Sequence, residues 1–340
     1  MGGDMKADGW LLADVLRDPA LCGALDASGW TALLAIARAE QLIGTLAHRL
    51  EGLPVPGAVG RILADARGSA AQGRVAALWE AEMARRALAP IGGPVVLLKG
   101  TAFVAAGLAA GQGRSIGDLD ILVPREAIAD VEAALISGGW EWVKPDPYDD
   151  AYYRRWMHEL PPLIHRDRDR MIDVHHTILP LTARITPDPA AIIADSLRLE
   201  NGQHVPSGPD MLVHAAAHLF ADGDLAGGMR NLWDVHRLVE EFGLEGVADR
   251  AAHHGLSREM ARAIRVSAAL YGTDVPSEWL QLTSADRLYL HRLTARDGWG
   301  RAVRPATRFG FYIRSHWLRM PPLMLARHLW AKWRRGGTLR

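Results

Sequence analysis

Residues 114–123, RSIGDLDILV, place two aspartates at the start of an apolar run. Asp118 and Asp120 are separated by one residue and lie among Leu, Ile and Val, a composition that favours a buried β-strand. Because side chains alternate along a strand, both carboxylates are predicted to face the same side of a sheet. Two carboxylates on one face can share divalent cations, so this stretch predicts a metal site on a strand.

The stretches around this strand complete a small α/β unit, here called the palm. Residues 94–100, PVVLLKG, form a short apolar run that ends in glycine and indicates another buried strand. Residues 101–111 have room for about three helical turns, and residues 125–139 have the spacing and terminal glycines of a helix. Further strands are predicted at residues 139–143 (GWEWV), 162–166 (PLIHR) and 171–178 (MIDVHHTI). The last two are expected to be antiparallel because no helix separates them.

Helical sequence surrounds the palm. From about residue 9 to 89, and again after about Pro187, Ala, Leu and Ile recur at three- and four-residue spacing. We therefore expect an α+β fold in which a small mixed-sheet palm is flanked by N-terminal and C-terminal helical regions. The expected boundaries are 1–90 for the N-terminal helical region, 91–186 for the palm, 187–297 for the C-terminal helical region and 298–340 for a basic, aromatic-rich tail.

Composition narrows the class of protein. The 340-residue chain is 49% hydrophobic, which is sufficient for a sizeable core. Its single cysteine, Cys22, excludes an internal disulfide and a cysteine-based zinc site, and favours a reducing compartment. The acidic N-terminus lacks the pattern of a secretory signal, and no uncharged run is long enough to cross a bilayer as a helix. We expect a cytoplasmic protein.

Charge is distributed unevenly along the chain. The formal net charge is zero, but residues 298–340 contain ten Lys or Arg and no Asp or Glu, so an acidic body carries a basic tail. The tail interleaves Arg with aromatic residues and Leu, which fits an amphipathic helix on an anionic membrane surface, a contact with a partner protein, or a helix packed on the acidic body. Packing on the body is favoured, and a peripheral membrane location is the alternative. The acidic body disfavours broad nucleic-acid binding.

Three features of the palm indicate phosphate and metal chemistry. Gly100 allows close backbone approach, and a helix that starts near Thr101 would offer unpaired amides and a positive dipole end to a phosphate. Asp118 and Asp120 supply two carboxylates. Asp173, in the apolar context of residues 172–174, is expected on a neighbouring strand as the third. Magnesium takes oxygen ligands and would offset the repulsion and desolvation of three clustered carboxylates.

The order of these motifs resembles the DNA polymerase β-like nucleotidyltransferase superfamily. LLKGTAFVAAG, RSIGDLDILVPREAIADVEAAL and IDVHHTI are most similar to a bacterial family of uncharacterised nucleotidyltransferases, and the similarity extends over about residues 25–320. The resemblance implies a nucleotidyltransferase palm that transfers a nucleoside monophosphate from an NTP to an acceptor hydroxyl and releases pyrophosphate. It also implies two Mg²⁺ ions, with Mn²⁺ as an alternative, and ATP is the expected nucleotide.

The resemblance assigns roles by position. Asp118 and Asp120 match the paired metal ligands, and Asp173 matches the third acid, so these three are the candidate catalytic residues. The candidate nucleotide-binding residues are Lys99, Gly100, Thr101, Arg114 and Ser115. The sequence departs from the usual pattern by placing threonine after Gly100 and by a longer gap between Gly100 and Asp118. Lys99 and Arg114 have an alternative role as solvent-directed side chains.

Two further questions stay open at the level of sequence. His214 and His218 lie one helical turn apart, a spacing that suits zinc, but they lack a partner and helix packing is favoured. His175 and His176 follow the third acid, and only one of them can face the site.

The alternative function is a non-catalytic interaction or regulatory protein that retains the scaffold. The retained acids argue against that alternative, and the acceptor is not specified by the sequence.

Overall fold

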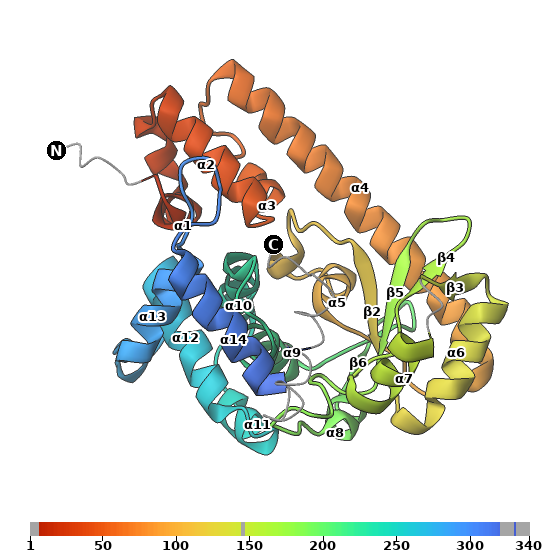
Figure 1. The fold of residues 1–340 in the computed structure, drawn as a ribbon. Coiled ribbons are helices and arrows are strands. Elements are labelled where there is room, and N and C mark those ends of the chain that lie inside the picture. Colours follow the sequence, from red (N-terminus) through yellow and green to blue (C-terminus); the bar gives the residue numbers. More distant parts are fainter. Residues whose placement is uncertain (1–6, 144–146, 320–329, 331–340) are drawn as a thin grey trace.

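The computed structural model describes residues 7–143, 147–319 and 330 (Figure 1). The N-terminal part is helical, and its first two helices begin at capping carboxylates. Asp8 accepts a hydrogen bond from the amide of Trp10, and Asp26 accepts one from the amide of Gly29. These N-terminal helices are α1 (Gly9–Arg17), α2 (Ala27–Ala39), α3 (Ile43–Arg49) and the 32-residue α4 (Gly57–Leu88). Helix α4 runs from the N-terminal helices to the sheet, where it contacts β2 and α6 (Figure 1).

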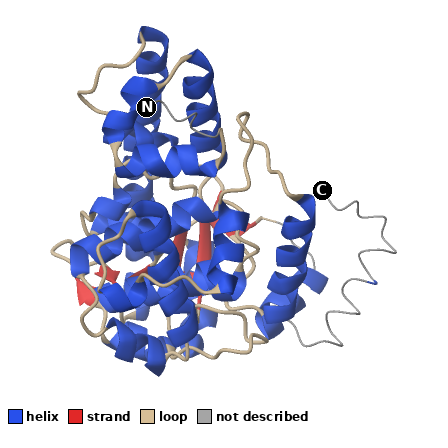
Figure 2. Ribbon diagram, turned by 90° about the vertical axis from the view of Figure 1, so that its left-hand side faces the viewer, coloured by secondary structure: helices blue, strands red, loops and turns tan. Residues whose placement is uncertain are grey.

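A seven-stranded mixed sheet is flanked by helices (Figure 2). The strand order is β3-β4-β5-β2-β1-β7-β6. The strands β2 and β5 are parallel, whereas β1 is antiparallel to β2 and β4 is antiparallel to β5. The strands are β1 (Val96–Leu97), β2 (Asp118–Leu122), β3 (Trp140–Trp142), β4 (Leu163–His165), β5 (Met171–His175), β6 (Leu197–Arg198) and β7 (His204–Val205).

The structure confirms the expected α+β class. All five strands predicted for the palm are present, and β4 and β5 are antiparallel as expected. Strands β6 and β7 were not predicted, because they come from a segment in which the sequence indicated only helices. Helix α5 (Lys99–Ala105) is shorter than the predicted three turns. It ends before Gly107, which adopts a left-handed φ of 72°.

The remaining helices fall into two groups, one in the palm and one toward the C-terminus. Helix α6 (Ile128–Ser137) packs on α4, and α7 (Pro147–Trp156) precedes β4. After β7, helix α9 packs against α10, α11, α12 and α5. These C-terminal elements are α8 (Pro189–Ala194), α9 (Gly208–Ala217), the π-helical turn η5 (His218–Asp222), α10 (Gly228–Phe242), α11 (Val247–His253), α12 (Ser257–Tyr271), α13 (Ser284–Leu293) and α14 (Pro305–Arg319).

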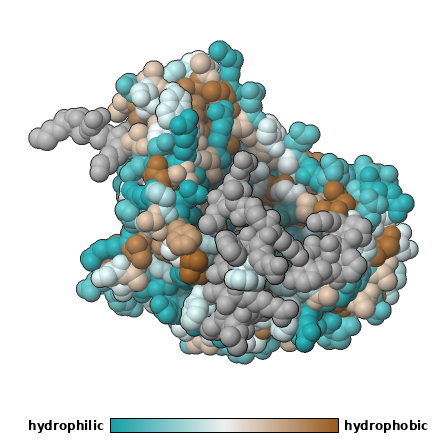
Figure 3. All heavy atoms as spheres, in the orientation of Figure 1, coloured by the Kyte–Doolittle hydropathy of each residue, from teal (hydrophilic) through white to brown (hydrophobic). Residues whose placement is uncertain are grey.

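The described surface mixes polar and apolar residues. On the face drawn in Figure 3, hydrophobic residues are interspersed with hydrophilic ones. Within the described ranges, none of the helices combines the length and the apolar character needed to cross a membrane.

Candidate active site

The three predicted acids meet on one face of the sheet. In the parallel pair β2 and β5, Asp120 lies directly opposite Asp173, and Asp118 is two residues before Asp120 on the same strand. Because side chains alternate, all three carboxylates lie on one face. One carboxylate oxygen from each of Asp118, Asp120 and Asp173 lies within 4.8 Å of the others. The strand register therefore builds the acidic triad that the sequence predicted.

Burial and mutual repulsion make this triad electrostatically costly, with Asp120 buried, Asp173 half-buried and Asp118 exposed. Asp120 is 3% exposed. Burial and the nearby Glu159 and Asp120 raise the pKa of Asp173 to about 7. Burial and Asp120 also raise the pKa of Asp118. Burial is the larger cause of both raised pKa values and neighbouring negative charge the smaller one, and a bound divalent cation would oppose both effects.

Lys99 is the cation that the chain itself supplies to this face. Its ammonium Nζ lies 2.5 Å from Oδ1 of Asp120. Burial alone would raise the pKa of Asp120, but Lys99 and His175 outweigh burial and hold that pKa below its ordinary value. Lys99 adopts a left-handed φ of 48° at the first residue of α5, which is uncommon for a side-chain-bearing residue. The sequence left two roles open for Lys99, a phosphate contact and a side chain directed to solvent. In the structure the side chain points to the carboxylate of Asp120 and not to solvent.

The other candidate nucleotide-binding residues are not equally close to the triad. Gly100 packs on the side chain of Arg114, and a Cβ at this position would collide with the guanidinium. Thr101 is buried in α5. Ser115 is exposed and lines a separate hollow that includes Gln41 and Arg170. The close approach that Gly100 permits is therefore made by Arg114 in this structure.

Arg114 is held by a buried charge network. Its Nη1 pairs with Oδ2 of Asp234 on α10, while its Nε is buried without a hydrogen-bond partner among the described residues. Arg230 donates from Nε to Oδ1 of Asp234 at 3.1 Å and from Nη2 to the carbonyl oxygen of Ala110 at 3.1 Å. This network joins α10 to the loop that leads into β2.

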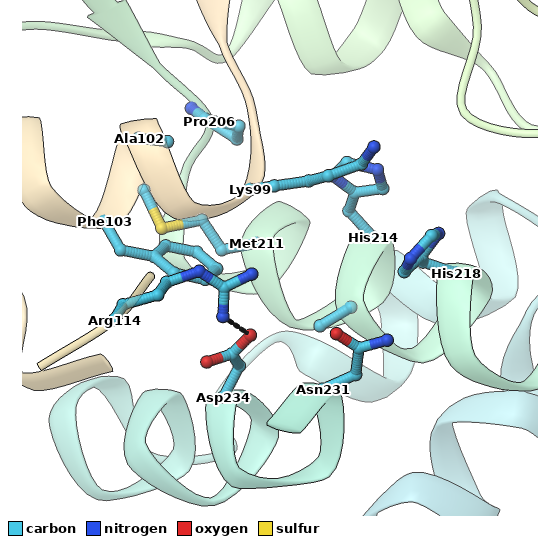
Figure 4. A pocket seen from close by; sticks show the side chains of 11 residues that line it. Lys99, Ala102, Phe103, Arg114, Pro206, Met211, His214, His218, Asn231 and Asp234 are labelled. Atoms are coloured by element: carbon cyan, nitrogen blue, oxygen red, sulfur yellow. Dashed lines mark hydrogen bonds and ion pairs between the residues drawn. The ribbon is translucent and has the colours of Figure 1, made fainter. Parts of the chain in front are cut away.

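A pocket lies between α5, α9 and α10, next to the triad (Figure 4). Lys99 and Arg114 line one side, and His214 and His218 line another. Burial and the charge of Lys99 lower the pKa of His218 to about 4, and the same two causes hold the pKa of His214 well below its usual range. Both imidazoles are therefore neutral at pH 7. His214 and His218 therefore line a pocket, which their spacing in the sequence did not predict.

Two residues beside the triad were not predicted from the sequence. His158 and Glu159 follow α7, and the segment that contains them pairs with β5. Of the two histidines after Asp173, His175 is the one that faces the site, because its Nε2 lies 2.9 Å from Oδ1 of Asp120. Because Asp173 and His175 are two residues apart on one strand, the sequence could have predicted that they share a face. No local pattern predicted that His158 or Glu159 lies at the site.

Parallel strands with three clustered carboxylates, placed beside a half-buried lysine at the start of a short helix, form an acidic site suited to a divalent metal. This acidic triad is of the kind typical of nucleotidyltransferases. Residues 26–272 match the model of the family described as uncharacterised nucleotidyltransferase, and the chain belongs to this family. The resemblance inferred from the motifs is thereby confirmed. A comparison with curated proteins finds no match.

Proposed function

We propose that the protein is a magnesium-dependent nucleotidyltransferase. In the proposed reaction, an acceptor hydroxyl attacks the α-phosphorus of an NTP, a new phosphate ester bond forms, the bond to the β-phosphate oxygen breaks, and pyrophosphate leaves. The hydroxyl proton passes to a base or to solvent. The observation that carries the proposal is the register that places Asp120 opposite Asp173, with Asp118 on the same face.

The donor set fits magnesium. Three carboxylates within 4.8 Å of one another offer the oxygen ligands that Mg²⁺ takes, with Mn²⁺ as an alternative ion. The raised pKa of Asp173 and the ammonium of Lys99 beside Asp120 both support the need for added positive charge at this face. Bound Mg²⁺ would neutralise phosphate charge and lower the pKa of the acceptor hydroxyl. Asp118 and Asp120 would hold both ions, and Asp173 would hold the ion on the acceptor side.

The remaining roles belong to groups of the chain itself. When nucleotide binds, the ammonium of Lys99 would leave Asp120 and pair with a phosphate oxygen of the nucleotide. Arg114, whose Nε has no partner among the described residues, would donate to the same triphosphate from its place against Gly100. Thr101 and Ser115 stay proposed contacts of the triphosphate. ATP is the nucleotide that we expect.

The acceptor is the open part of this function. The experiment is to incubate the full chain with each labelled NTP, Mg²⁺ and a lysate separated into small-molecule, protein and RNA fractions. We expect one fraction to acquire label in a Mg²⁺-dependent way, and Asp120→Asn to abolish the labelling. Labelling that is unchanged in Asp120→Asn would overturn the proposed role of the triad. Asp130→Asn on α6 is the matched control, because Asp130 is exposed and lies away from the strands.

The basic tail stays a second proposed contact surface. Its described helix α14 packs on the body, with Phe311 buried and Trp317 within 4.3 Å of the guanidinium of Arg184. Residues 320–329 and 331–340 of the tail lie outside the described residues. Flotation with anionic vesicles at low salt, compared with a chain truncated near residue 300, tests the membrane role. If the full chain does not float, the remaining contacts for the tail are the body, a partner protein or the acceptor.

A further inference from the structure

A second cluster of potential metal ligands lies beside the acidic triad. It consists of His158, Glu159 and His175. Backbone pairing fixes the three residues together. The amide of His176 donates to the carbonyl oxygen of His158 at 2.9 Å, and Glu159 forms an antiparallel bridge with His175. Directly opposed residues of an antiparallel pair project from the same face, so Glu159 and His175 are aimed at one point.

The ligand atoms are separated by distances close to those around a bound metal ion. Nε2 of His175 lies 3.5 Å from Oε2 of Glu159, and Nε2 of His158 lies 3.7 Å from the same oxygen. One ligand atom from each of the three residues lies within 4.8 Å of the others. With bonds of about 2.1 Å, neighbouring ligands of a tetrahedral zinc ion are about 3.4 Å apart. Small side-chain movements would therefore bring all three atoms onto one ion.

His175 is buried, His158 is largely buried, and the hydrogen-bonding capacity of both rings is incompletely used. The side chain of His175 is 2% exposed and that of His158 is 12% exposed. Nδ1 of each ring has no hydrogen-bond partner among the described residues. In the metal-free protein, Nε2 of His175 donates to the carboxylate of Asp120. Because Nδ1 of each ring has no partner to displace, a metal-bound ring can carry its proton on Nδ1. That tautomer leaves the Nε2 lone pair directed at Glu159 available as a ligand.

The chemistry of this cluster differs from that of the triad. Asp118, Asp120 and Asp173 offer only oxygen, which suits Mg²⁺, whereas two imidazoles and one carboxylate suit Zn²⁺ and similar transition ions. We propose that His158, Glu159 and His175 form a binding site for a divalent transition metal ion of the zinc type, distinct from the acidic triad. Three protein ligands leave a coordination position for water or another ligand.

The position of the cluster couples it to the triad. Nε2 of His175 also lies 2.9 Å from Oδ1 of Asp120, so an ion bound to Nε2 replaces that hydrogen bond. Occupation of the site therefore changes the environment of Asp120. The proposal does not rest on nucleotidyl transfer, because metal binding is measured without nucleotide or acceptor.

Equilibrium dialysis of the full chain against Zn²⁺, in excess Mg²⁺ and without nucleotide, tests this site. We expect one Zn²⁺ per chain to be retained, and His158→Ala and Glu159→Gln each to weaken retention by at least about tenfold. His214→Ala removes a pocket histidine outside the cluster and should retain Zn²⁺ as the wild type does. Circular dichroism confirms that each variant is folded.

Visible absorption of bound Co²⁺ provides a second measurement on the unaltered chain. We expect ligand-field bands of a nitrogen-ligated site that are displaced by Zn²⁺ and not by excess Mg²⁺. Equal Zn²⁺ affinity in wild type and His158→Ala would overturn the proposal. So would Zn²⁺ retention that depends on His214, or Co²⁺ bands that Mg²⁺ removes.

Discussion

The ammonium of Lys99 lies 2.5 Å from Oδ1 of Asp120, on a carboxylate that is 3% exposed. The negative charge of this buried carboxylate is balanced by a cation of the chain itself. Because the proposed metal ions need the same carboxylate, the ammonium and the metal compete for Asp120. The proposed function therefore requires the Lys99 side chain to leave Asp120 when metal and nucleotide bind.

Replacement of Lys99 separates its effects on metal and on nucleotide. Lys99→Met removes the competing cation, so we expect metal affinity in the absence of nucleotide to rise by about tenfold or more, equivalent to about 1.4 kcal/mol. NTP affinity should fall because a phosphate contact is lost. Mn²⁺ titration followed by electron paramagnetic resonance measures the first effect. Lys99→Arg keeps the charge and should leave metal affinity near that of the wild type. Weaker Mn²⁺ binding in Lys99→Met would contradict the competition.

The pKa of Asp173 predicts that metal binding depends on pH. Burial and neighbouring acids raise this pKa to about 7 in the metal-free protein, so Asp173 carries a proton below about pH 7. A metal ligand must be deprotonated, so metal binding should release a proton below this pH and become stronger as pH rises to about 7. Calorimetry in buffers of different ionisation enthalpy measures the released proton. Asp173→Asn should abolish that release, and Asp130→Asn should retain it.

Gly100 and Gly73 should respond oppositely to a single added methyl group. A Cβ at Gly100 would collide with Arg114, whereas a Cβ at Gly73 on α4 meets open space. We expect Gly100→Ala to destabilise the fold by about 1–3 kcal/mol and to displace Arg114, which weakens NTP binding. Gly73→Ala should be stabilising by up to about 1 kcal/mol, since alanine is the better helix former. Urea unfolding measures both, and equal effects would refute the packing of Gly100 on Arg114.

The buried network around Asp234 should be far more sensitive than an exposed ion pair on the same helix. Asp234→Ala leaves Arg114 and Arg230 without their shared carboxylate, so we expect a loss of about 3–5 kcal/mol in the free energy of unfolding. Glu240→Ala removes the more exposed partner of Arg237 and should cost less than about 1 kcal/mol. Denaturant titration of the two variants compares these costs. Similar small losses would show that the network does not anchor α10.

Local sequence patterns predicted the five strands of the palm and missed β6 and β7. The alternation in DLDIL was sufficient to predict β2 and the shared face of Asp118 and Asp120. Strands β6 and β7 are two residues long, which is too short for any periodicity to be visible. The length of α5 was overestimated because a run of Ala and Leu masked the left-handed Gly107.

The parts of the site that no pattern predicted are long-range contacts. Arg114 and Asp234 are 120 residues apart, and no local spacing links them. Glu159 reaches the triad only because its segment pairs with β5. Such contacts depend on the tertiary arrangement, whereas the alternation of a single strand depends on the local chain alone.

In the proposed function, the three acids hold metal for nucleotidyl transfer and Asp173 acts on the acceptor side. The most direct measurement compares NTP affinity and turnover in Asp173→Asn, Asp120→Asn and the control Asp130→Asn with the labelled acceptor fraction. Asp120→Asn should lose both Mg²⁺-dependent nucleotide binding and turnover. Asp173→Asn should retain much of the nucleotide affinity and lose turnover by roughly a thousandfold, about 4 kcal/mol in activation free energy. Normal turnover by Asp173→Asn would contradict the account.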